Sequence, residues 1–224
     1  MRHRPVSLLL VAALLLAASA PCQPAQASPG PAQDAASAAP AAAAPAPGKT
    51  YNIADLGFVP SGWMGDAEPA HGRLLRTEIS ADAPPGVRAS QRWIYSVRRA
   101  ANSVGWAAVA WQYPESNWGR QPGKDLSELG ITEISFWAKG VADRNGRYPI
   151  VQFKSGGQSN ATFPYHASYL VEGNFVELTG TWKAYTFRLS GRNLTSVISA
   201  FTFALRALDN PNGAEFSVAQ IEFR

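Results

Sequence analysis

The chain has 224 residues and carries 20 basic and 16 acidic side chains, and its single cysteine is Cys22. Two of the basic residues, Arg2 and Arg4, lie in a segment that we expect to be removed, which leaves 18 basic against 16 acidic residues. This near-neutral balance, with basic residues scattered along the chain, argues against a nucleic-acid partner. Removal of Cys22 with the same segment excludes disulfides, zinc–thiolate sites and cysteine nucleophiles.

The N-terminus has the pattern of a secretory signal peptide. Arg2, His3 and Arg4 precede an unbroken apolar run from Leu8 to Ala18, which corresponds to the charged and apolar regions of such a signal. A membrane-spanning helix needs about 20 apolar residues, and neither this run nor any later one reaches that length. We therefore expect no membrane span.

The cleavage site decides where the mature chain begins. Ala25-Gln26-Ala27 has the small residues that signal peptidase requires, whereas a cut after Ala20 would leave Pro21 at the new terminus. We predict a signal peptide over residues 1–27 and a secreted or periplasmic protein. The alternative is a lipid anchor on Cys22, which lacks the usual leucine in the residues before it.

Residues 28–48 differ sharply in composition from the rest of the chain. Of these 21 residues, 15 are Ala or Pro, none is aromatic, and Asp34 is the one charged residue. Such a segment cannot bury a hydrophobic core, and its prolines favour an extended backbone. We interpret it as a tether ahead of one folded domain, residues 49–224.

The domain reads as an all-β sandwich of the jelly-roll type. After Thr50, short β-rich segments alternate with turns rich in Gly, Pro, Asn and Asp, as in Asn145-Gly146. The segment Leu194–Ser199 is ambiguous between strand and short helix. The predicted strands are Leu74–Ile79, Arg92–Val97, Trp106–Tyr113, Ile131–Lys139, Ile150–Lys154, Phe175–Leu178, Trp182–Leu189, Phe201–Arg206 and Glu215–Phe223.

Alternation along these strands sorts side chains by face, because successive residues point to opposite sides of a sheet. Phe136 and Phe153 are predicted to face the core, and Trp137, Gln152 and Lys154 to face outward. Trp106, Ala108, Ala110 and Gln112 alternate in the same way against Val109 and Trp111. The pattern indicates a polar sheet face that also carries Trp and Gln.

The segment from Trp111 to Gly119 is rich in aromatic and amide side chains. An exposed aromatic ring can stack on the C–H face of a sugar while amides and charged groups bind its hydroxyls. The alternative is that the aromatic rings fill the core, which is as plausible for Trp111 and Trp182. The candidate ligand-binding residues are Trp106, Gln112, Tyr113, Asn117, Trp118, Trp137, Gln152 and Lys154.

No catalytic or metal motif stands out. His71 and His166 have no His or Cys at a ligand spacing, Ser61 lacks the sequence of a nucleophile elbow, and no signature pairs an acid with a base. Two carboxylates could still meet in space as in a glycosidase. Asp66 and the Asp209–Asn212 turn could supply oxygen ligands to Ca²⁺, although Asp and Asn are also ordinary turn residues.

Several blocks, taken in order, resemble bacterial secreted domains of the galactose-binding-like jelly-roll type, which are similar to non-catalytic carbohydrate-binding modules. The resemblance implies a module that binds a polysaccharide or oligosaccharide, with no cofactor beyond a structural Ca²⁺. Such domains commonly place paired aspartates before the final Ile, where this chain has Ala219 and Gln220, so the expectation of Ca²⁺ is weakened. The blocks are residues 61–66, 106–119, 124–127, 134–140, 182–185 and 189–191.

Three hypotheses follow. The first is a glycan-binding module, expected to be a monomer, with a platform formed by Trp106, Trp118 and Trp137. The second is a jelly-roll polysaccharide lyase, suggested by residues 76–78 and 153–156, which are similar to short motifs of alginate-lyase-like sandwiches, although the Gln-x-His segment of those enzymes is absent. The third is a protein-interaction domain of the cell envelope that uses the same aromatic face.

Overall fold

The computed structural model describes residues 48–97, 102–157 and 162–224. The predicted signal peptide and the tether up to residue 47 lie outside the described residues. No helix within the described ranges is long and apolar enough to span a membrane. Helical structure there consists of two short 3₁₀ turns, Pro69–His71 and Ser127–Leu129. The strands are β1 (Tyr51–Asn52), β2 (Val59–Gly65), β3 (Leu75–Ser80), β4 (Ser90–Tyr95), β5 (Trp106–Gln112), β6 (Glu133–Val141), β7 (Ile150–Gly156), β8 (Leu170–Glu177), β9 (Lys183–Arg188), β10 (Ser199–Arg206) and β11 (Ala214–Phe223).

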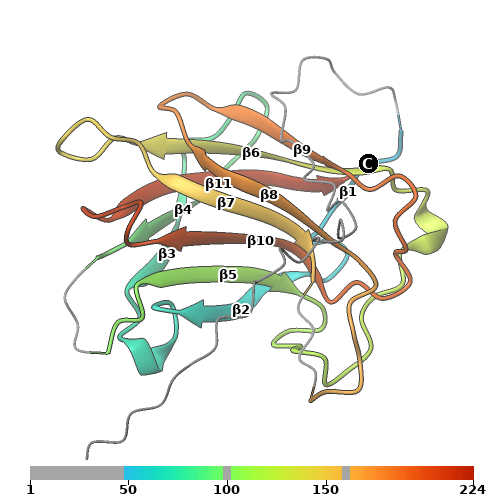
Figure 1. The fold of residues 1–224 in the computed structure, drawn as a ribbon. Coiled ribbons are helices and arrows are strands. Elements are labelled where there is room, and N and C mark those ends of the chain that lie inside the picture. The colour runs from blue at the N-terminus through green and yellow to red at the C-terminus, as the bar shows by residue number, and fades with distance from the viewer. Residues whose placement is uncertain (1–47, 98–101, 158–161) are drawn as a thin grey trace, which may run out of the picture. The chain divides into compact units, whose positions relative to one another are not determined.

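The strands form two antiparallel sheets, which lie against each other (Figure 1). One sheet has the order β3-β4-β11-β6-β9, with β1 paired to β11, and the other has the order β2-β5-β10-β7-β8. Most connections carry the chain from one sheet to the other, so sequence neighbours such as β5 and β6 belong to different sheets. The predicted jelly-roll β-sandwich is confirmed.

Aromatic rings join the two sheets across the core. The ring centroids of Trp93 on β4 and Phe203 on β10 are 4.9 Å apart. The ring centroid of Phe136 on β6 is 4.7 Å from those of both Phe153 and Phe201. All five side chains are buried. Each contributes about 1.5–3 kcal/mol by removal from water, so the core holds the domain without covalent crosslinks. The inward faces predicted for Phe136 and Phe153 are confirmed.

All nine predicted strands are present, although β8 begins five residues before its predicted start at Phe175 and the short β1 was not predicted. Strand β2 was not predicted, because Pro60 and Gly62 are typical of turns. It forms an edge strand with a register shift between Pro60 and Gly62, where proline is tolerated because one side of the strand needs no hydrogen-bond partner. The ambiguous segment around Val197 is not helical, since Val197 forms a β-bridge to Lys124.

Buried tyrosines make the fold sensitive to alkaline pH. Burial raises the pKa of Tyr169 well above its ordinary value, and burial together with a hydrogen bond to Asp66 does the same for Tyr95. A folded-state pKa above the unfolded one means that this contribution to stability is complete below about pH 10 and is lost as the pH rises further. We expect the urea midpoint to fall between about pH 10 and pH 12.

The variant Tyr169→Phe tests this expectation. It removes the hydrogen bond to Ser155 Oγ and should cost about 1 kcal/mol at pH 7, but its stability should decline less than that of the original chain on going to alkaline pH. The measurement is urea unfolding followed by tryptophan fluorescence at several pH values. An equally steep alkaline decline in both proteins would contradict the assignment to Tyr169.

Candidate functional site

A groove of about 480 Å³ lies on the outer surface of the five-stranded sheet. Its lining comes from all five strands of this sheet, β2, β5, β10, β7 and β8, and from the turn that follows β10. Strand alternation explains the composition: inward positions of these strands fill the core, and outward positions form the groove. The lining side chains include Met64, Trp106, Ala108, Lys154, Phe175, Thr202, Ala204, Arg206 and Leu208.

Small side chains make the sheet surface hollow. Ala108 of β5 is the register partner of Ala204 of β10, and Ala110 is the partner of Thr202. Gly62 of β2, opposite Ala110, lies against the Gln112 side chain, and neither Gly62 nor Ala110 lines the groove. Since Ala108, Thr202 and Ala204 do not extend far above the backbone, larger side chains on either side of them become walls.

Two aromatic rings form those walls. Trp106 begins β5 and is 40% exposed, and Phe175 of β8 lies across the sheet, opposite Gln152 of β7. The indole of Trp106 lies against Gly65, where an added Cβ would come within 2.9 Å of the ring. Gly65 also has a φ of +61°, a conformation that favours glycine. The backbone therefore supports the ring from the β2 side.

Charged side chains of the groove are paired with opposite charges. Lys154 Nζ bonds the Glu172 carboxylate, and Arg206 bonds Asp209. The Arg206 guanidinium also lies 4.0 Å from the centre of the Phe175 ring, a cation–π contact that holds both side chains in place. The groove thus offers polar donors and acceptors with little net charge.

A buried carboxyl group fixes the chain that leads into Trp106. The oxygens of Asp66 accept hydrogen bonds from Tyr95 OH at 2.7 Å, from Ser103 Oγ at 2.8 Å and from the backbone N–H of Val104 at 2.7 Å. The Asp66 N–H donates to the Trp106 carbonyl at 2.7 Å. This network connects β4, the turn after β2 and the start of β5.

The structure brings three of the eight predicted binding residues to this sheet face: Trp106, Gln152 and Lys154. Gln152 is half-buried and donates through Nε2 to the Gly173 carbonyl at 3.0 Å. Gln112 belongs to the same outward row of β5 as Trp106, but it is completely buried and accepts a hydrogen bond from Ser61 Oγ. It does not line the groove.

The loop after β5 holds three further predicted residues. Asn117 is 2% exposed, and its amide donates to the carbonyls of Tyr113 and Gln121 and accepts from the N–H groups of Gly119 and Gln121. Its hydrogen-bonding capacity is therefore used within the loop. Tyr113 packs on Phe58 with 5.8 Å between ring centroids. Trp118 is half-buried in the same loop and does not line the groove.

Trp137 lies on the opposite side of the sandwich. It belongs to β6 of the six-stranded sheet, where its register partners are Ala219 and Ala184. Its outward side chain therefore points away from the five-stranded sheet that carries Trp106. The expectation that Trp106, Trp118 and Trp137 form one platform is wrong, because Trp106 lies on the five-stranded sheet and Trp137 on the six-stranded sheet.

Of the groove lining, sequence reasoning named only Trp106 and Lys154 as binding residues, and the larger side chains that it missed include Met64, Phe175 and Arg206. Arg206 could have been found, since Phe201, Phe203 and Leu205 alternate with it on a predicted strand. Phe175 was predicted to lie on a strand, but its side chain was not assigned to either side of the sheet. A register shift between β7 and β8 interrupts the simple alternation there. Met64 was not considered as a groove residue, because it belongs to β2, which was not predicted.

The carboxylates considered for Ca²⁺ have other partners. Asp66 accepts the three hydrogen bonds described above, Asp209 pairs with Arg206, and Asn210 bonds the backbone of Ile150 through both ends of its amide. In the described part of the chain, no three His, Cys, Asp or Glu side chains come together as a metal site would require. The expectation of no cofactor, with the case for a structural Ca²⁺ weakened by Ala219 and Gln220, stays a prediction.

Comparisons with known proteins give remote similarities of fold. No protein-family model and no curated protein matches the chain. A family 30 carbohydrate-binding module is 14% identical, with 74% of this chain and 82% of that one covered and a TM-score of 0.46. The family 30 module of a cellulosomal cellulase from Clostridium thermocellum is 14% identical over 75% and 93%, with a TM-score of 0.45. The CBM22-1 xylan-binding domain of Paenibacillus barcinonensis Xyn10C is 12% identical over 79% and 92%, with a TM-score of 0.40.

The chain is similar to these modules in fold. At such low identity, the assignment of a jelly-roll sandwich rests on the strand pairing of the chain itself.

The two short motifs that suggested a lyase lie in different sheets. Arg76 and Glu78 belong to β3 of the six-stranded sheet, whereas Lys154 belongs to β7 of the five-stranded sheet. Glu78 is paired with Arg92 at 2.7 Å, and Lys154 with Glu172. The motifs therefore do not converge on one site and do not support a lyase.

Proposed function

We propose that the groove of the five-stranded sheet binds a polysaccharide or oligosaccharide and that the domain does so without catalysing a reaction. The observation that carries the proposal is the pair of aromatic walls, Trp106 and Phe175, on either side of a floor of alanine and threonine. An open groove of this kind admits the interior of a chain as well as its end.

The chemistry of the lining fits a sugar. The indole of Trp106 provides an apolar surface for the C–H face of a ring, and its 40% exposure leaves area to be buried on binding. Gln152, Lys154 and Arg206 provide hydrogen-bonding groups beside that surface. Stacking adds only about 0.5–1.5 kcal/mol beyond area burial, so we expect modest affinity for each ring.

The setting of the domain is part of the proposal. The signal peptide predicted over residues 1–27 would export the chain to the periplasm or the medium. The Ala/Pro-rich tether would hold the domain away from whatever precedes it. The domain would act there as a monomer, because it buries its core within one chain.

A pair of matched substitutions tests the groove. Ala204→Arg puts a long side chain on the groove floor, while Ala184→Arg adds the same side chain to the outer face of the other sheet, next to Trp137. We expect the original chain and Ala184→Arg to be retarded in affinity gels that contain the recognised polysaccharide, and Ala204→Arg to migrate freely. Circular dichroism checks that both variants are folded.

Two results would overturn the proposal. One is free migration of the original chain across a panel of plant, algal and bacterial polysaccharides. The other is equal retardation of both variants, which would place any binding away from the groove. Release of unsaturated sugar ends, measured by ultraviolet absorbance, would contradict a non-catalytic role.

A further inference from the structure

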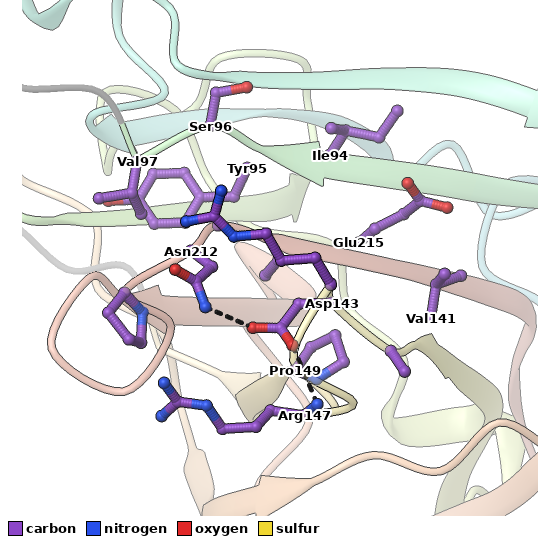
Figure 2. A pocket seen from close by; sticks show the side chains of 15 residues that line it. Ile94, Tyr95, Ser96, Val97, Val141, Asp143, Arg147, Pro149, Asn212 and Glu215 are labelled. Atoms are coloured by element: carbon purple, nitrogen blue, oxygen red, sulfur yellow. Dashed lines mark hydrogen bonds between the residues drawn. The ribbon is translucent and has the colours of Figure 1, made fainter.

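A second hollow, of about 530 Å³, lies at one end of the sandwich and shares no lining residue with the groove. Its walls are the end of β4, the loop between β6 and β7, and the loop between β10 and β11 (Figure 2). A volume of this size is within the range of about 300–1,000 Å³ that holds small ligands. We call it the end pocket.

The acidic side chains of the end pocket are already occupied. Asp143 Oδ1 accepts hydrogen bonds from the N–H groups of Asn145 and Arg147, and Oδ2 accepts one from Asn212 Nδ2 at 2.7 Å. The bond from Asn212, followed by the backbone bonds, holds the pKa of Asp143 below its ordinary value. Glu215 accepts two hydrogen bonds from Arg92.

The two arginines of the end pocket, Arg144 and Arg147, differ from these acidic residues in their side-chain partners. Neither side chain forms an ion pair within residues 48–97, 102–157 and 162–224, although both line the pocket. Figure 2 shows the Arg147 side chain extending away from the Asp143 carboxylate, which bonds only the backbone N–H of that residue. Both guanidinium groups are thus without a direct ion-pair partner in the described residues, although the charge of Arg147 also helps to lower the pKa of Asp143.

The loop that carries these arginines is held in one shape. Asp143 N–H donates to the Arg147 carbonyl at 2.8 Å, and Gly146 N–H donates to the Asp143 carbonyl at 2.9 Å. The bond between Asp143 and Asn212 ties this tight turn to the loop before β11. Both arginines therefore project from a backbone that is positioned before any ligand arrives, which lowers the entropic cost of binding.

We propose that the end pocket binds a small ligand that carries a carboxylate or sulfate group, through Arg144 and Arg147. A guanidinium presents paired N–H donors whose spacing matches the oxygens of such groups. Val97, Val141 and Pro149 line the same pocket and offer apolar surface for the rest of the ligand. The arginines are exposed, so the affinity is modest and falls as salt is added.

The test is a two-dimensional ¹H–¹⁵N NMR titration of the folded chain at low ionic strength. Galacturonate, galactose and sulfate are the probes, since galactose has the same ring without the carboxylate. We expect galacturonate or sulfate to shift the resonances of residues 141–149 and 211–215, and galactose to leave them unchanged. A response to galacturonate identifies the carboxylate, and a response to sulfate alone identifies the sulfate group.

Variants separate this pocket from general charge attraction. Arg144→Ala combined with Arg147→Ala should weaken anion binding at least about tenfold, whereas Arg147→Lys should weaken it less because the charge is kept. Arg192→Ala is the matched control, because Arg192 follows β9 at the end of the sandwich opposite the loop after β6. Equal weakening by Arg192→Ala, an equal response to galactose, or no response to either anion would overturn the proposal. None of these outcomes depends on the groove.

Discussion

Replacing Trp106 by alanine is expected to lower the affinity for the recognised polysaccharide at least about tenfold, which corresponds to about 1.4 kcal/mol. The substitution removes an aromatic wall of the groove and the apolar area that a sugar ring would bury. Isothermal titration calorimetry with a soluble oligosaccharide, or gel retardation with the polymer, measures the loss. Phe175→Ala is expected to act in the same direction from the opposite wall.

Trp137→Ala is the control for this prediction. It removes an indole of the same size from the outer face of the other sheet, so the affinity should stay within about twofold of the original, well under the 1.4 kcal/mol that a tenfold change represents. If Trp137→Ala lost binding and Trp106→Ala kept it, the ligand would lie on the six-stranded sheet. That result would restore a role for Trp137 and reject the groove.

Removing the carboxyl group of Asp66 is expected to have the largest effect on stability. Asp66→Ala should lower the free energy of unfolding by about 3–5 kcal/mol, because it leaves the buried donor of Tyr95 and the part-buried donors of Ser103 and Val104 without their charged acceptor. Unfolding in urea, followed by fluorescence, gives the difference. A loss below about 1 kcal/mol would show that water or a shifted loop replaces the carboxyl group.

Smaller substitutions in the same network provide a graded comparison. Ser103→Ala removes one donor and should cost about 1–2 kcal/mol, and Asp66→Asn keeps the shape while changing one acceptor oxygen into a donor. Asp66→Asn should therefore fall between the other two. Because the Asp66 carboxylate accepts a hydrogen bond from the backbone N–H of Val104, two residues before Trp106, its loss should alter the environment of the Trp106 indole, which NMR can observe.

Much of the fold follows from patterns that are local along the chain. Alternation with a period of two placed Phe136 and Phe153 in the core and Gln152 and Lys154 outside, and the structure agrees. Strand β2 was missed because Pro60 and Gly62 are typical of turns, and only an edge position in the finished sheet makes them acceptable.

The candidate site was harder to predict, because a side chain that points outward in a sandwich can face either of two directions. Trp106 and Trp137 both alternate against core residues, and their strands are neighbours in the sequence. The chain nevertheless crosses from one sheet to the other between β5 and β6, so their side chains point to opposite sides. Asn117 illustrates a related limit. The amide-rich segment around it suggested a ligand contact, whereas in the folded domain Asn117 is buried and its hydrogen bonds stabilise its own loop.

The sequence by itself determined the all-β character of this domain, most of its strands and many side chains of its core, because the alternation of apolar and polar residues is a property of each segment alone. The pairing of β5 with β10 and of β10 with β7 was decided only in the tertiary structure. Together with the pairing of β7 and β8, this arrangement placed the alanines of two strands side by side and set Trp106 and Phe175, nearly 70 positions apart in the sequence, on either side of them to form the groove.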